Sequence, residues 1–334
     1  MKINKSIKIF INYFLGPILF AWLSYSIYQQ IKHQPDLENS WQMIRTSFGS
    51  PKVLLLGATF LLMIVNWGIE AFKWKMAIQK VQQVSYLTAF KAILSGTSFS
   101  VTTPNRVGEY LGRLLYMHEG NRLKAISLTI AGSMSQLLVT LLMGLTGFFV
   151  LREPITNGHI LGGVWIQAIV YGVSAALLVL TVFYLRLSWI IRWIDRLPRL
   201  RNYAWLLKGL EDFNATLLLR ILSLSLVRFF VFLTQYFLLF RLFNVDVSWW
   251  QGCWAVSVSF LVMAVLPTIA LFTDLSLKGK ISLQLLGLFS GNSLGIWATS
   301  VTIWFINLII PALAGSLLIL GIKRIFKNNN DEKI

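Results

Sequence analysis

The chain has 334 residues, of which 56% are hydrophobic and 13% are charged, and its formal net charge at pH 7 is +17. Soluble globular proteins have roughly 45–50% apolar and about 25% charged residues, so the composition excludes a soluble enzyme and indicates an integral membrane protein. One cysteine, Cys253, excludes an intrachain disulfide, and three scattered histidines leave little for a zinc centre, so no cofactor is expected.

Six apolar segments are long enough to cross a bilayer core of about 30 Å as helices. They fall near residues 9–31, 53–72, 124–151, 160–185, 214–243 and 293–321. Two further apolar stretches, about 84–117 and 248–290, are each interrupted by a proline, Pro104 or Pro267, with ionisable residues just after it. Non-helical backbone at membrane depth is tolerated only where protein or water surrounds it. We therefore expect two re-entrant hairpins, each made of two half-helices.

The distribution of basic residues tests this arrangement, because Lys and Arg collect in cytoplasmic loops. With the N-terminus inside, the expected cytoplasmic segments hold 21 of the 30 Lys and Arg residues, and the outer segments hold seven. This ratio favours six spans with both termini in the cytoplasm. The positive charge is spread over five segments rather than gathered on one face, which argues against nucleic acid as a partner. Attraction of anionic lipid is a second role open to these residues.

The order of the elements is two-fold. Two spans, a hairpin and a span occur from residue 9 to residue 151, and the same order occurs again from 160 to 321. The basic stretch 186–208 suggests a junction between halves at about 1–185 and 186–327. The first hairpin would enter from the cytoplasm and the second from outside, which is the pattern of an inverted repeat with a substrate site between the halves. We therefore expect an all-α polytopic membrane protein with a single integral membrane domain over 1–327 and a disordered polar tail over 328–334.

The segment around Pro104 carries the most informative polar residues. Thr103 and Pro104 suit the N-cap and the first position of a half-helix. The i, i+3, i+7 spacing of Arg106, Glu109 and Arg113 would then place all three on one helix face. A helix N-terminus with two arginines beside it suits a phosphate, and the carboxylate could hold the arginines or receive a cationic headgroup. The alternative is a structural salt-bridge cluster that pins the hairpin.

Two other ionisable residues also fall within predicted spans. Arg228 lies near the middle of its span and needs a partner, which Glu70 or Glu109 could supply, and its role is equally open between function and structural pairing. For Glu70 we favour structural pairing with a hairpin arginine. The candidate residues for binding a lipid headgroup are Asn105, Arg106, Glu109, Arg113 and Arg228, and the candidates for carrying an ion or proton are Glu70, Glu109 and Asp274.

The chain resembles the lysylphosphatidylglycerol synthase transmembrane family, which includes the flippase half of the multiple peptide resistance factor. The family pattern Pro–x–Arg–x–Gly–Glu–x–x–x–Arg is matched by Pro104, Arg106, Gly108, Glu109 and Arg113. Weaker matches are the aromatic-basic residues 72–74 and the segment 311–315 in the last span. In the second hairpin, residues 267–274 lack the Gly-rich turn of the family, which leaves open whether Asp274 replaces the family's glutamate.

The resemblance implies that the chain moves or handles a lipid across the bilayer. The leading hypothesis is a flippase-like protein of the bacterial cytoplasmic membrane that acts on an anionic or aminoacylated phospholipid or on a polyprenyl phosphate lipid. No nucleotide-binding loop of the Gly-x-x-x-x-Gly-Lys type is present, so net pumping would need an ion or proton gradient, and passive equilibration is equally allowed.

Two other function classes remain open. The first is a membrane-embedded transferase that uses Glu109 and Asp274 as an acid–base pair, although no aminoacyl-transferase domain is expected in these 334 residues. The second is an accessory subunit that positions a lipid for a partner enzyme. A homo-oligomer is compatible with each of these hypotheses.

Overall fold

Helices are the regular elements of the chain. The computed structural model describes residues 25, 42, 45–46, 51–101, 103, 106–158, 160, 162–186, 214–266 and 274–320, and these residues contain no strand. Five helical segments are long and apolar enough to cross a membrane: Val53–Ile78, Glu119–Val150, Gly163–Leu185, Ala215–Leu242 and Ser293–Ile319. Helices that could cross a membrane are therefore present at five of the six predicted spans. The predicted span near 9–31 and the tail 328–334 lie outside the described part of the chain, apart from residue 25.

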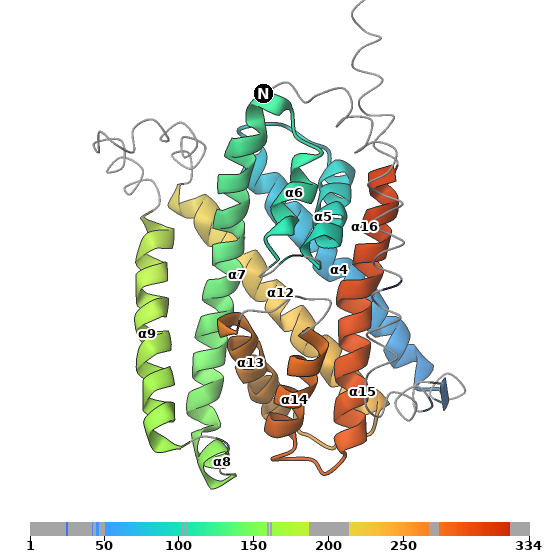
Figure 1. The fold of residues 1–334 in the computed structure, drawn as a ribbon, viewed down its shortest axis with the longest axis vertical. Helices are drawn as coiled ribbons and strands as arrows, with labels where there is room; N and C mark the ends of the chain where they lie inside the picture. The colour runs from blue at the N-terminus through green and yellow to red at the C-terminus, as the bar shows by residue number, and fades with distance from the viewer. Residues whose placement is uncertain are drawn as a thin grey trace, which may run out of the picture.

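The long helices form the frame of the molecule (Figure 1). α4 (Val53–Ile78) packs along α12 (Ala215–Leu242), and α7 (Arg122–Val150) packs beside α9 (Gly163–Leu185). A 3-10 turn (Glu119–Asn121) precedes α7, and the short helix α8 (Arg152–Asn157) follows it. α15 (Ser293–Trp304) continues through a π-helical turn (Phe305–Ile309) into α16 (Ile310–Leu320). The last predicted span is thus one long element with a π turn in its middle.

Each stretch that the sequence predicts to be a hairpin contains two packed helices. The first pair is α5 (Tyr86–Ser100) with α6 (Gly108–Leu114), and the second is α13 (Trp249–Val265) with α14 (Asp274–Leu286). The pairs lie at opposite ends of the molecule, and in each pair the end of the first helix and the start of the second, together called its turning end here, lie toward the middle (Figure 1). Pro104 and Pro267 are in the breaks between the paired helices but lie outside the described residues.

Polar side chains at the helix starts satisfy backbone N–H groups that have no partner within the helix. Ser85 caps α5, and Ser248 forms a capping box with Gln251 at the start of α13. The prediction that the second half-helix begins at Thr103–Pro104 is wrong, because α6 begins at Gly108. The Thr103 hydroxyl still accepts a hydrogen bond from the Gly108 N–H at 2.7 Å. It therefore caps the first backbone N–H of α6 although it is five residues away in the sequence.

Small residues allow α5 and α6 to pack at short range. A Cβ added to Gly112 would lie 2.4 Å from the backbone of Gly96 and of Ser95, so the two backbones are in contact there. Glycines spaced four residues apart, such as Gly108 and Gly112, allow this close approach of two helix backbones. The contact fixes where α6 lies along α5, and hence the position of the charged side chains that α6 carries.

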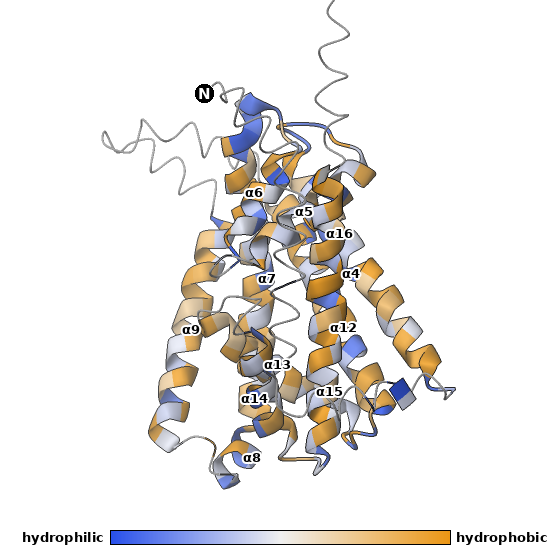
Figure 2. Ribbon diagram, turned by 45° about the vertical axis from the view of Figure 1, so that its right-hand side comes forward, coloured by the Kyte–Doolittle hydropathy of each residue, from blue (hydrophilic) through white to orange (hydrophobic). Residues whose placement is uncertain are grey.

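The surface of the long helices is apolar. Figure 2 shows hydrophobic residues along most of α4 and α9, and hydrophilic residues at the upper end of α7 and in α8. On α9 the exposed side chains include Tyr171, Leu178 and Val182. Soluble monomers rarely expose apolar area on this scale, so these faces are suited to contact with lipid.

Candidate functional site

The carboxylate of Glu70, in α4, is the centre of a buried ionic cluster. Lys73 Nζ lies 3.2 Å from one of its oxygens, and Arg113 Nη2, from α6, lies 3.1 Å from the other. Arg228 Nη1, from α12, also contacts the carboxylate. A buried charge is costly unless it is paired and hydrogen-bonded, so these side chains from three helices depend on one another.

Arg228 has further partners that hold it in place. Its Nε donates a hydrogen bond to Asn66 Oδ1 at 2.7 Å, and its guanidinium carbon lies 5.8 Å from the centre of the Trp67 ring. Two turns further along α12, Gln235 donates to the backbone carbonyl of Thr59 at 2.9 Å. These contacts join α12 to one face of α4. The expected pairing of Arg228 with Glu70 is present in the structure.

A second carboxylate completes the cluster. Glu109 contacts Arg113 one turn away on α6, and its side chain is half-buried whereas that of Arg113 is buried. Glu70, Lys73, Glu109, Arg113 and Arg228 together are here called the Glu70 cluster. It contains three cations and two carboxylates, which leaves one positive charge in excess. Within it, Arg113 Nε is buried without a hydrogen-bond partner among the described residues.

A separate ionic contact joins the turning ends of the two helix pairs. Arg106 Nη2, from the break before α6, lies 3.8 Å from Asp274 Oδ2 at the start of α14. Lys278 Nζ, one turn along α14, lies 3.5 Å from the same oxygen. The Arg106 side chain is 47% exposed, whereas that of Asp274 is 4% exposed. The guanidinium is therefore open to a ligand while its carboxylate partner is covered by protein.

The prediction that Arg106 shares a helix face with Glu109 and Arg113 is wrong. Arg106 precedes α6 and has a φ of 59°, in the left-handed region, so helical periodicity does not extend back to it. Its side chain reaches Asp274, whereas Arg113 reaches Glu70 and Glu109. The predicted site residues therefore form two groups. Asn105, the remaining candidate, lies outside the described residues.

Two cations of these groups are absent from the sequence-based prediction. The predicted span near 53–72 ends before Lys73, but α4 continues to Ile78 and buries it. Lys278 lies in the second predicted hairpin, and the structure places it one turn from Asp274. The signal that could have found both is their helical spacing from a carboxylate, since Lys73 follows Glu70 by three residues and Lys278 follows Asp274 by four.

The donor set of both groups suits an anion. Arginine and lysine offer charge-assisted N–H donors, which bind carboxylate and phosphate oxygens strongly. Within the described part of the chain, no three His, Cys, Asp or Glu side chains lie together in the way that a metal ion requires. The chemistry available at this place is ionic binding.

Comparison with known families gives one match. The family model described as the lysylphosphatidylglycerol synthase TM region matches residues 13–273, which is more than half of the chain. No protein of curated function matches the sequence. The chain therefore belongs to the lysylphosphatidylglycerol synthase transmembrane family and is a multi-pass integral membrane protein.

Proposed function

We propose that this member of the lysylphosphatidylglycerol synthase transmembrane family translocates a lipid with an anionic headgroup across the membrane. The observation that carries the proposal is the contact between Arg106 and Asp274, which joins two helix pairs from opposite ends of the molecule. Arg106 is the accessible partner of the two, so a headgroup phosphate entering between the pairs would bind to its guanidinium.

The proposal includes the insertion of the two pairs as re-entrant hairpins from opposite sides, in an inverted repeat. Helix lengths support it. At 1.5 Å per residue, the 15 residues of α5 and the 17 residues of α13 extend about 22 and 26 Å, less than the roughly 30 Å of the hydrocarbon core. Neither helix alone crosses the whole core as an upright helix, so each can turn back within the core and return to the side from which it entered. The basic residues favour both termini inside, and the family resemblance implies a bacterial cytoplasmic membrane.

Charge supports an anionic ligand rather than a neutral one. The Glu70 cluster has one positive charge in excess, and Arg106 and Lys278 exceed Asp274 by another. Arg106 precedes Gly108 by two residues, and Arg113 follows Gly108 by five, which is roughly 8 Å along α6, so both surpluses act on the same region. The phosphate group of a lipid would neutralise one of them. Candidate lipids with such a phosphate are phosphatidylglycerol, its aminoacylated form, in which amino groups offset the phosphate charge, and a polyprenyl phosphate.

Net pumping would require a coupled ion or proton. Among the three candidate carboxylates, Glu70 is surrounded by cations and Asp274 is buried, whereas Glu109 is half-buried and contacts Arg113. Glu109 is therefore the best placed to exchange a proton with water. A membrane-embedded transferase is less well supported, because Glu109 and Asp274 each have cationic partners of their own.

The test is a translocation assay with the purified protein in vesicles. Phosphatidylglycerol, aminoacylated phosphatidylglycerol and polyprenyl phosphate, each with a fluorescent label, are compared by quenching from one side. Since hydrogen bonds to charged groups contribute about 1.5–3 kcal/mol, Arg106→Gln should slow translocation by about tenfold or more. The matched control is Arg220→Gln, which removes the same charge from an exposed position on α12. Absence of movement for all three lipids would refute the proposal, and headgroup turnover would favour the transferase.

A further inference from the structure

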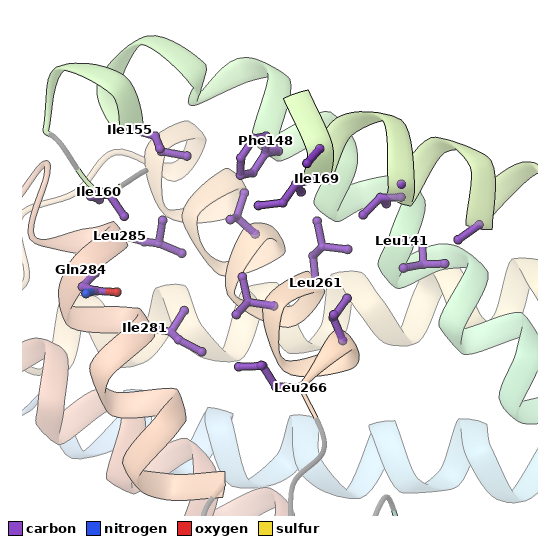
Figure 3. A pocket seen from close by; sticks show the side chains of 17 residues that line it. Leu141, Phe148, Ile155, Ile160, Ile169, Leu261, Leu266, Ile281, Gln284 and Leu285 are labelled. Atoms are coloured by element: carbon purple, nitrogen blue, oxygen red, sulfur yellow. The ribbon is translucent and has the colours of Figure 1, made fainter. Parts of the chain in front are cut away.

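An apolar pocket of about 560 Å³ lies between α7, α9, α13 and α14 (Figure 3). In Figure 3 the side chains of Leu141, Phe148, Ile169, Leu261 and Leu285 surround the space, and they come from all four helices. Gln284, at one edge, is the one side chain in the lining with polar atoms. Small-molecule sites are pockets of about 300–1,000 Å³ with mostly hydrophobic walls, so the size and lining fit a ligand that is almost entirely apolar.

The pocket is open on the side of α9. Ala168, Gly172 and Ala176 line it at positions i, i+4 and i+8, and all three are exposed. Elsewhere on α9 large side chains such as Tyr171 and Leu178 cover the surface. The small residues therefore leave a gap along one face of a helix whose outer surface is suited to lipid, so a hydrocarbon chain in the bilayer could enter from the side.

We infer that this pocket binds one acyl chain of a glycerophospholipid whose headgroup is held at Arg106, an inference that rests on the proposed function. The volume sets the size of the ligand. If a methylene group takes roughly 30 Å³, the share of a water molecule in the liquid, the pocket holds roughly eighteen carbon atoms. This is one acyl chain. Two chains, or the long branched chain of a polyprenyl lipid, exceed the space.

The geometry of α14 connects the pocket to the ionic contact. Ile281 and Leu285 follow Asp274 by seven and eleven residues, which places the three side chains on one stripe of the helix. Ile281 lies about 10 Å along the axis from Asp274. At the end of α13, Leu266 lines the pocket directly before the break that leads to Asp274. A phosphate at Arg106 and an acyl chain in the pocket would thus lie along the same helix pair.

The experiment maps where the chain of a lipid lies. The full-length protein is placed in vesicles of phosphatidylethanolamine and phosphatidylglycerol that contain phosphatidylglycerol with a photoreactive diazirine on one acyl chain. After irradiation, mass spectrometry locates the adducts. We expect adducts on the α7 and α13 lining, including Phe148 and Leu261, in excess over those on the outer face of α9.

A pocket-filling variant provides the comparison. A Cβ added to Gly172 meets no atom within 4 Å, so Gly172→Leu should fold and occupy the mouth. Since each displaced methylene weakens binding, the adducts in the lining should fall by about tenfold. Ala176→Leu is a second filling variant. Gly57→Leu is the matched control, because Gly57 is also an exposed helical glycine with open space around it, and it is not part of the pocket.

Three outcomes would overturn the inference. One is an even spread of adducts over the lining and the outer face of α9, and another is equal labelling of the lining by a polyprenyl probe. The third is an absence of adducts in the lining together with a lower Tm for both filling variants, which would mean that protein fills the pocket. Translocation that continues without pocket labelling contradicts this inference alone, and pocket labelling without translocation contradicts the proposed function alone.

Discussion

Arg106 and Asp274 meet across the turning ends of two helix pairs that are far apart in the sequence, with Nη2 and Oδ2 3.8 Å apart. Each residue stands at the edge of a break, Arg106 just before α6 and Asp274 at the first position of α14. The contact therefore links the two halves of the molecule through residues beside the starts of α6 and α14. If a headgroup passes between the pairs, this contact has to open.

Covalent closure of this contact should stop lipid movement. In a Cys253→Ser background, Arg106→Cys and Asp274→Cys are combined and joined by a short thiol-reactive linker. We expect translocation to fall to the level of protein-free vesicles, because the turning ends can no longer separate. After reduction of a cleavable linker it should return to the slower rate of the unlinked double-cysteine protein, which lacks the Arg106 guanidinium. Each single cysteine treated with the same linker controls for the loss of charge. Unchanged transport in the linked protein would mean that the pairs need not separate.

The long spans were predictable from composition, because an apolar run of 18 or more residues is typical of a membrane-spanning helix. The breaks were predictable as well, since a proline between two short apolar stretches at membrane depth does not fit a straight helix. The orientation of Arg106 was not predictable. It depends on a left-handed backbone at one residue, which the pattern of neighbouring side chains does not encode.

The Glu70 cluster was predictable only in part. An arginine in the middle of a span requires a partner, so the pairing of Arg228 with Glu70 or Glu109 could be expected. The spacing of three residues between Glu70 and Lys73 indicates a pair only if α4 continues past its apolar run, and the hydropathy pattern ends that span before Lys73. Since a long helix that is buried by its neighbours can include charged residues beyond the hydrophobic limit, hydropathy underestimates its length.

Glu70→Gln should destabilise the fold strongly. Removal of this carboxylate leaves Lys73, Arg113 and Arg228 close together with one carboxylate fewer to balance them. Breaking a buried ion pair by removing one partner costs about 3–5 kcal/mol, so the Tm in detergent should fall clearly. Glu153→Gln, which removes a carboxylate from an exposed position in α8, should leave the Tm unchanged. Equal Tm values for the two variants would show that the Glu70 cluster contributes little to stability.

Gly112→Ala should disrupt the packing of α6 on α5. The added methyl group would lie 2.4 Å from the backbone of Gly96, which cannot move as a flexible side chain can. Overpacking of this kind costs about 1–3 kcal/mol, and the shift of α6 should also move Arg113 away from Glu70. We expect a lower Tm and slower translocation. Gly132→Ala is the control, because a Cβ there meets no atom within 4 Å and alanine favours the helix; a similar loss in both variants would contradict the packing argument.

The opposite insertion of the two helix pairs can be tested at their outer ends. His118 follows α6 and Gly291 follows α14, and both are exposed positions away from the turning ends. In a Cys253→Ser background, single cysteines at these two positions should react with a membrane-impermeant maleimide from opposite sides of sealed vesicles. His118→Cys is expected on the cytoplasmic side, because the basic residues near it favour that side. Labelling of both from one side would exclude an inverted repeat, because two hairpins that enter from the same surface cannot be related by an axis in the membrane plane.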